Sequence, residues 1–205
     1  MRLWPFKRAE KRDASTDPSW GHLVNGGAVS ASGQFVDAKA AETIAAVYAA
    51  VQTLAESTAC LPLHVYQRKA DGDRERADDH PLARALRQPN AHQSGLSFRE
   101  AMTAAVLLHG NAYARIEYDA TANVKALHPI NPRAVTVVKL ASGRYRYEYA
   151  EDNGALVRLL DDEVFHLADR TEPGSIMGKS RIAIARDTLG LGLSLRDHGA
   201  SDRKS

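Results

Sequence analysis

The sequence predicts an α+β protein in which helices pack on an antiparallel β meander, and three observations indicate this class. The apolar residues change from helical to alternating spacing at Pro62. A second helical segment stops at Gly110, a typical helix terminator. From residue 112 to residue 168, short strand-like runs follow one another without helices between them, which favours an antiparallel sheet over βαβ units.

The length and composition predict one globular domain. The 205 residues are enough for a core, and the hydrophobic fraction of 44% and the charged fraction of 25% are ordinary for a soluble protein. No run approaches the ~18 apolar residues that cross a bilayer. The segment Met1–Arg8 lacks the apolar centre of a secretory signal, so we expect no membrane partner. Cys60 is the only cysteine, which excludes an intrachain disulfide and predicts synthesis in a reducing cytoplasm.

The charge pattern argues against sequence-specific nucleic-acid binding. The 27 basic residues are matched by 25 acidic ones, which leaves a net charge of +2. The one basic cluster lies in residues 1–37, a Ser-, Gly- and Asp-rich stretch that we predict to be a flexible N-terminal arm: Lys7, Arg8, Lys11 and Arg12. A solvated tail is the simpler interpretation, with a nucleic-acid contact as the alternative. The folded domain is then expected over residues 38–205.

The domain is predicted to begin with one long helix over residues 38–59. Its apolar residues recur at three- and four-residue steps and line one face: Ile44, Val47, Tyr48, Val51, Leu54 and Ala55. In this register Leu54 faces the sheet, so Leu54→Ala should be costly. Pro62 ends the helix because it has no N–H and disfavours the α conformation of Leu61. A strand over residues 63–68 then leads into an Asp71-Gly72 turn.

Three more helices and six strands are expected. A short helix over residues 81–87 has Pro81 in its first turn. Ser97 and Glu100 form a capping box for a helix over residues 97–109, which packs on the sheet together with the first helix. Turn residues separate strands over 112–118, 124–130, 134–140, 144–149, 155–160 and 164–168. The last helix is predicted over residues 180–196.

The triplet Gly178-Lys179-Ser180 is the most plausible site for chemistry, since it follows a predicted strand and opens a predicted helix. A phosphate-binding loop needs a glycine five positions before Gly178, but Pro173 occupies that position and has no N–H to donate. Gly174 is one residue too close. We therefore interpret the triplet as a helix start with Ser180 near the cap. A nucleotide-binding enzyme that uses Lys179 is the alternative.

No other group of residues predicts catalysis, a cofactor or a metal. The histidines that lie outside the arm are scattered singly, without a second ligand at i+3 or i+4: His64, His80, His92, His109, His128, His166 and His198. A zinc site assembled across strands stays open as an alternative. Cys60 is interpreted as a buried structural thiol.

The remaining polar groups have simple structural interpretations. The carboxylate pairs Asp78-Asp79 and Asp161-Asp162 are expected to be solvated turn residues. In the strand 144–149, alternating arginines and aromatics could stack on bases, although a half-buried strand with its tyrosines in the core is the simpler interpretation. These tyrosines are Tyr145, Tyr147 and Tyr149.

Eight short motifs, each weak alone, occur in the order in which they occur in the HK97-like family of phage portal proteins. They cover about residues 40 to 200 and are Cys60-Leu-Pro-Leu-His-Val-Tyr66, Asp71-Gly-Asp-Arg-Glu-Arg-Ala77, Asp79-His-Pro-Leu-Ala-Arg-Ala-Leu86 with Pro89-Asn90, Phe98-Arg-Glu-Ala-Met102, Leu107-Leu-His-Gly-Asn-Ala-Tyr113, Ala126-Leu-His-Pro-Ile-Asn-Pro-Arg-Ala-Val-Thr-Val137, Asp162-Glu-Val-Phe-His-Leu167 and Gly178-Lys-Ser-Arg-Ile-Ala-Ile-Ala-Arg186. The chain therefore resembles this family. The resemblance assigns the Gly178 triplet to a family motif and not to a phosphate loop.

The resemblance implies a non-catalytic subunit of a portal ring, the head-tail connector through which double-stranded DNA is packaged and ejected. Family members form a dodecamer at one capsid vertex of the virion and are made in the host cytoplasm. The implied partners are the chain itself, the terminase large subunit, the major capsid protein, a head-tail adaptor and DNA that passes non-specifically. The sequence matches the outer, wing-like portion and ends before the stem, clip and crown. A truncated prophage remnant, or an isolated wing domain that acts as an interaction module, is therefore the alternative.

Overall fold

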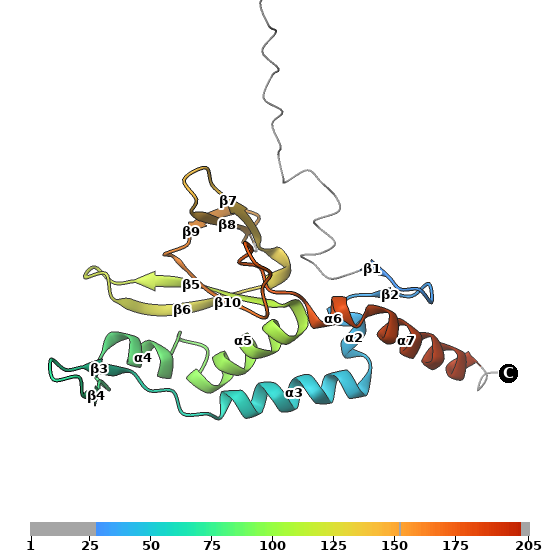
Figure 1. Cartoon of the computed structure of the whole chain (residues 1–205), viewed down its shortest axis with the longest axis horizontal. Helices are drawn as coiled ribbons and strands as arrows, with labels where there is room; N and C mark the ends of the chain where they lie inside the picture. Colours follow the sequence, from blue (N-terminus) through green and yellow to red (C-terminus); the bar gives the residue numbers. More distant parts are fainter. Residues whose placement is uncertain (1–27, 152, 202–205) are drawn as a thin grey trace, which may run out of the picture.

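The computed structural model describes residues 28–151 and 153–201, and it shows an α+β protein, as predicted (Figure 1). The helices are α2 (Ala38–Glu42), α3 (Ala45–Ala59), α4 (Pro81–Arg87), α5 (Gly95–His109), the 3₁₀ helix η1 (Pro132–Ala134), α6 (Arg181–Ile184) and α7 (Arg186–Ser201). The strands are β1 (Ala28–Val29), β2 (Phe35–Val36), β3 (Tyr66–Arg68), β4 (Arg74–Arg76), β5 (Asn111–Tyr118), β6 (Val124–Ile130), β7 (Thr136–Lys139), β8 (Tyr145–Ala150), β9 (Leu156–Leu160) and β10 (Val164–Ala168). All pairings among these strands are antiparallel.

The six central strands form two sheets and not one meander, which corrects the prediction. The strands β7, β8 and β9 do form a meander, but β10 returns to pair with β5, giving a second sheet in the order β10-β5-β6. The start of β5 is buried on both faces, so it needs a cover on each side. Helix α5 covers one face through Phe98 and Met102, and the β7-β8-β9 sheet covers the other.

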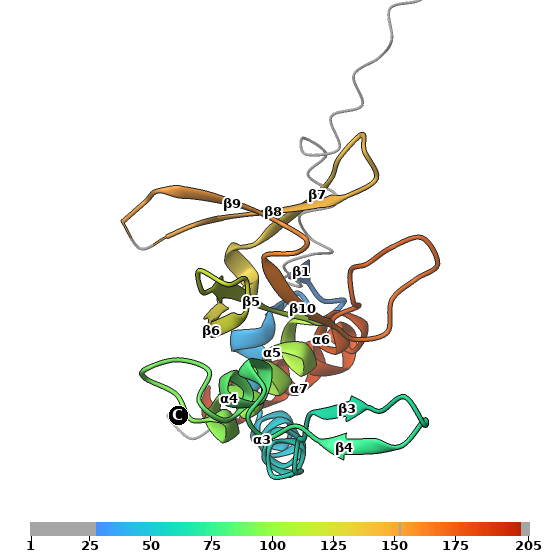
Figure 2. The ribbon, with the colours of Figure 1, turned by 90° about the vertical axis from the view of Figure 1, so that its left-hand side faces the viewer.

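The elements are stacked in layers. The two views show the β7-β8-β9 sheet above the β10-β5-β6 sheet, with α5 beneath it and α3 outermost (Figures 1 and 2). The inter-sheet core contains Tyr113, Tyr147 and Tyr149, so the tyrosines of β8 face the core as predicted. Helix α5 packs directly on the β10-β5-β6 sheet and α4 lies against β6, whereas α3 packs mainly on α5.

The helix predicted over residues 38–59 is broken in two, which corrects that prediction. Thr43 donates from its N–H and its hydroxyl to the carbonyl of Ala40, and this ends α2. Ile44 then adopts an extended backbone before α3 begins, and its side chain packs against the core cluster that contains Val36 and Leu193. The competing side-chain hydrogen bond and the tertiary packing of Ile44 override the helical pattern.

The expected orientation of Leu54 is also wrong. Leu54 is 49% exposed, whereas Ala55 and Ala59 are buried against α5. Small residues at this contact allow the two helices to approach closely. Arg99 of α5 also stabilises this helix–helix contact, because its guanidinium donates two hydrogen bonds (3.1 and 2.6 Å) to the carbonyl of Ala59 at the end of α3.

Helix α5 begins earlier than the predicted capping box. Its N-cap is Ser94, whose hydroxyl accepts a hydrogen bond from the Ser97 N–H at 3.2 Å, while Glu100 reaches across to Gln52. The capping-box prediction at Ser97 is therefore wrong, since Ser94 takes the capping role three residues earlier. The other end agrees with the prediction, since Gly110 adopts the left-handed conformation with φ of 78°.

The two ends of the described chain pack together. The predicted arm lies mostly outside the described residues, but residues 28–36 form the β1-β2 hairpin, and Val36 is fully buried. The Ala31 N–H donates to the carboxylate of Asp187 in α7, which holds the hairpin on that helix. The predicted helix over 180–196 is divided at Ala185 into α6 and α7. Contact with α7 thus gives a defined structure to residues 28–36, although their sequence shows neither the helical nor the alternating spacing of apolar residues.

Candidate functional site

The best-built polar site is a junction where the end of α5 and the start of β5 meet the chain between β10 and α6. The Asp169 N–H donates to the Gly110 carbonyl at 2.8 Å. The Asn111 side chain makes two hydrogen bonds with Gly178, accepting from its N–H at 2.8 Å and donating to its carbonyl at 2.9 Å. The Ser180 hydroxyl donates to the Leu108 carbonyl at 2.9 Å. Asn111 and Ser180 are both buried, so these bonds are shielded from water.

Two glycines make this contact possible. A Cβ atom on Gly178 would lie 2.1 Å from the Gly110 carbonyl oxygen and 2.5 Å from the Asp169 nitrogen. A Cβ atom on Gly110 would lie 2.5 Å from the carbonyl carbon of Lys179. Because the neighbouring atoms belong to the backbone, no rotation of a side chain can relieve either clash.

A chain of side-chain hydrogen bonds links the junction to the second sheet. The Asn111 Oδ1 atom already accepts from Gly178, so His166 must donate to it from Nε2 (3.0 Å). The Nδ1 atom of His166 is then the acceptor for the Tyr147 hydroxyl at 3.2 Å. Burial lowers the pKa of His166 to about 4, which keeps the imidazole neutral and in this tautomer near pH 7. Tyr113 stacks on the ring of His166 with centroids 4.6 Å apart, and burial raises the pKa of this tyrosine.

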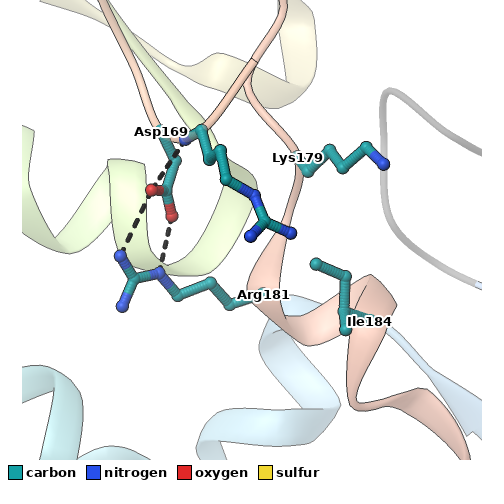
Figure 3. A pocket seen from close by; sticks show the side chains of 5 residues that line it. Asp169, Lys179, Arg181 and Ile184 are labelled. Carbon is teal, nitrogen blue, oxygen red and sulfur yellow. Dashed lines mark hydrogen bonds and ion pairs between the residues drawn. The ribbon is translucent and has the colours of Figure 1, made fainter. Parts of the chain in front are cut away.

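Beside the junction lies an open pocket lined by Asp169, Arg170, Lys179, Arg181 and Ile184 (Figure 3). Arg181 pairs with Asp169 through Nε and Oδ2 at 2.6 Å, and this bond lowers the pKa of the carboxyl group. Lys179 extends away from that pair in Figure 3, and its ammonium group pairs with Glu172. Asp169, Arg181 and Lys179 therefore each have an oppositely charged partner, whereas Arg170 has no ion pair among the described residues.

The geometry argues against a phosphate loop at Gly178-Lys179-Ser180. The Gly178 N–H donates to Asn111, and the Lys179 N–H donates to the Arg170 carbonyl at 3.2 Å. The Ser180 hydroxyl caps α6 by accepting from the Ala183 N–H, as the helix-start interpretation predicted. Neither amide is available to cradle a phosphate.

The other residues singled out from the sequence are dispersed. Among residues 28–151 and 153–201, no group of three or more His, Cys, Asp or Glu side chains could hold a metal. In the same described part of the chain, no helix has the length and apolar character to cross a membrane. Cys60 is exposed, contrary to the expectation of a buried thiol. Arg144 pairs with both Asp161 and Asp162, and Arg76 pairs with Asp78, so these acids are not simply solvated.

Comparisons with known proteins decide the family. The profile of the family described as phage portal protein matches residues 45–202. The chain belongs to the phage portal protein family. It is 33% identical over 156 residues to the portal protein of Enterobacteria phage HK97, a match that covers 75% of this chain and 36% of that protein. It is 29% identical over 195 residues to a probable portal protein of Streptomyces phage phiC31, covering 90% of this chain and 41% of that one.

Solved structures share the fold. A chain from the neck of an empty gene transfer agent particle superposes with a TM-score of 0.66 at 25% identity, covering 76% of this chain and 42% of that chain. An HK97-family phage portal protein from Corynebacterium diphtheriae superposes with a TM-score of 0.55 at 18% identity, covering 80% and 49%. The chain thus spans well under half the length of the two curated portal proteins it matches. The resemblance inferred from the ordered motifs is confirmed.

Sequence reasoning missed Asn111 as the centre of the junction. Asn111 stands inside the motif Leu107–Tyr113, and Gly178 opens the last motif, so the resemblance contained both residues without showing that they touch. They are 67 residues apart, and no local pattern joins them.

Proposed function

We propose that the chain is a non-catalytic structural subunit of a portal ring at the head-tail vertex of a phage or phage-derived particle. The observation that carries this proposal is the family match over residues 45–202, together with the fold shared with a chain from a particle neck. The junction is consistent with a structural role, because its buried polar atoms are bonded to one another and none is directed toward a ligand.

The same proposal includes the partners that a packaging conduit requires: further copies of the chain, a capsid vertex, a terminase, an adaptor and double-stranded DNA. A conduit must let DNA slide, and each phosphate contact made by Lys or Arg strengthens non-specific binding. A net charge of +2 over 205 residues fits a subunit that does not hold DNA tightly.

The experiment is antibody labelling of particles released from the host that encodes the chain. We expect immunogold label at a single vertex, and label in the fraction of particles that have lost their tails. Label distributed evenly over the capsid, or confined to material that does not sediment with particles, would contradict the proposal. An antibody against a major capsid protein gives the evenly distributed control.

The enzymatic alternative has a direct test. Isothermal titration calorimetry with Mg²⁺-ATP should show no binding at micromolar concentrations, because the amides of Gly178 and Lys179 already donate within the protein. Micromolar binding that is lost in Lys179→Ala would restore the nucleotide-binding interpretation.

A further inference from the structure

The β3-β4 hairpin stands apart from the rest of the protein. The three residues of each strand are all exposed, and the hairpin extends away from the layers in both views (Figures 1 and 2). A two-stranded hairpin without a third strand or a helix to cover it is marginally stable in water. Such an element gains stability when another surface covers one of its faces.

One face of this hairpin has a specific chemistry. The register pairs Tyr66 with Arg76 and Arg68 with Arg74, so these four side chains lie on the same face. Arg76 is matched by Asp78, with Nε and Oδ1 2.7 Å apart. Arg68 and Arg74 are directly opposite one another and have no carboxylate partner among the described residues. Like charges opposite each other destabilise a hairpin, so an external anion would relieve the repulsion.

The complementary chemistry occurs where helices α3 and α5 of the same chain meet. Glu56 of α3 and Glu100 of α5 both accept from the amide of Gln52, at 2.5 and 3.2 Å. No Lys or Arg in the described part of the chain forms an ion pair with either glutamate. Tyr48, one turn before Gln52, is 55% exposed, as is Tyr66 on the hairpin. Each surface therefore offers two unmatched like charges and an exposed tyrosine.

We propose that the Tyr66/Arg68/Arg74 face of the hairpin binds the Glu56/Glu100 pair of a second copy of this chain. The inference rests on the proposed ring function for its context and adds the surfaces by which neighbours meet. The two surfaces differ, so the contact is heterologous, which is the kind of interface that generates rings. Guanidinium groups bind carboxylates through two parallel hydrogen bonds, and Arg and Tyr are enriched at the energetic centres of interfaces.

A mixing experiment tests the pairing. Arg68→Glu/Arg74→Glu places four acids in the contact, and Glu56→Lys/Glu100→Lys places four bases in it, so each variant alone should associate at least about tenfold more weakly than the parent chain. An equimolar mixture should recover association, because the acidic hairpin of the first variant matches the basic pair of the second. The control Lys39→Glu/Lys139→Glu has the same change of net charge as the arginine variant, on exposed lysines that form no ion pair within the described residues, and it should behave as the parent does.

Transient contact is detected by zero-length carbodiimide cross-linking, in which Arg68→Lys/Arg74→Lys supplies reactive amines without a change of charge. In a mixture of ¹⁴N- and ¹⁵N-labelled protein, we expect isotope-mixed peptides that join position 68 or 74 to Glu56 or Glu100. Absence of these mixed peptides at millimolar protein, or equal association of both charge-reversal variants and the parent, overturns the inference. Sedimentation of the parent chain into oligomers without these cross-links would leave the ring proposal standing and reject this interface.

Discussion

The substitution Gly178→Ala tests whether the junction sets the stability of the fold. The backbone of Gly178 does not adopt a positive φ, so alanine is conformationally acceptable and only space opposes it. The new Cβ atom would lie 2.1 Å from the Gly110 carbonyl oxygen and 2.5 Å from the Asp169 nitrogen. Ordinary carbon contacts are about 3.5 Å or longer, so the two chain segments must separate by more than about 1 Å.

That separation has two costs. It breaks or lengthens both hydrogen bonds between Asn111 and Gly178, each of which contributes about 1 kcal/mol, and leaves the buried amide of Asn111 poorly matched. Overpacking at a rigid contact adds about 1–3 kcal/mol. We therefore expect Gly178→Ala to lower the free energy of unfolding by about 3–5 kcal/mol, and the melting temperature by roughly 10 °C for a chain of this size.

Urea denaturation followed by circular dichroism measures the loss, and two glycines provide matched controls. A Cβ atom on Gly192 in α7 would have its nearest neighbouring atom 3.7 Å away, so Gly192→Ala should be neutral or stabilise by up to about 1 kcal/mol. Gly174 has φ of 81° and open space around it, so Gly174→Ala should cost only about 1–2 kcal/mol of backbone strain. A Gly178→Ala protein within about 0.5 kcal/mol of the parent would refute the reasoning.

Three further predictions follow from particular contacts. The pKa of His166 is about 4 in the folded protein and 6.5 in its ordinary state. Between these pH values the unfolded chain binds a proton that the folded chain does not, so the free energy of unfolding falls as the pH decreases from 6.5 to about 4. Between pH 7 and pH 5, His166→Gln should lose about 1–2 kcal/mol less stability than the parent chain, a figure discounted for partial exposure and measured by urea denaturation at each pH; the loss that remains includes that of His109, whose pKa is also lowered by burial. Ser94→Ala should cost about 1 kcal/mol and Ser97→Ala less, because Ser94 is the cap; equal losses in thermal melts would restore the capping box. Leu54→Ala should cost under about 1 kcal/mol, whereas Ala55→Leu should cost about 1–3 kcal/mol by overpacking the α3-α5 contact, and the reverse order in the same assay would contradict the helix register.

The positions of the strands were predictable because the signals that set them are local. Alternating apolar residues define each run, and glycines with positive φ turn the chain between them, at Gly143 and Gly154 for example. The partners of the strands were not predictable in this way. The pairing of β10 with β5 joins residues about fifty positions apart, and nothing in either strand distinguishes that partner from β9.

The helix boundaries show where tertiary structure overrides a local pattern. The apolar spacing of residues 38–59 is helical throughout, yet the helix is interrupted at Thr43 and Ile44. The Thr43 hydroxyl donates a hydrogen bond to the Ala40 carbonyl, and Ile44 leaves the helical conformation to pack against the core. The orientation of α3 was wrong for a related reason. Its buried residues are alanines, and a pattern that ranks residues by apolar size assigns the core position to Leu54 instead.

The candidate site was less accessible to sequence reasoning than the fold. Gly178-Lys179-Ser180 attracted a nucleotide-binding hypothesis because the residue types match, but the chemistry depends on whether the amides are available, and Asn111 occupies one of them. The hydrogen bonds that decide this run between segments that are distant in the chain. The ordered motifs identified the family correctly since each motif adds independent weight, even where the role of its residues was unknown.

The two surfaces proposed to meet between copies are both connected to helix α3, and this connection limits the geometry of any assembly. Glu56 lies on α3, and the hairpin is reached from the end of α3 through residues 60–65, in which Pro62 limits the backbone. Glu100 lies on α5, whose position relative to α3 is fixed by the hydrogen bonds from Arg99 to the Ala59 carbonyl. The rotation that relates one copy to the next therefore depends on the angle at which the hairpin leaves α3. A heterologous contact closes into a ring only when that rotation is the same between every pair of neighbours, and a short, proline-restricted connection between α3 and the hairpin favours such uniformity.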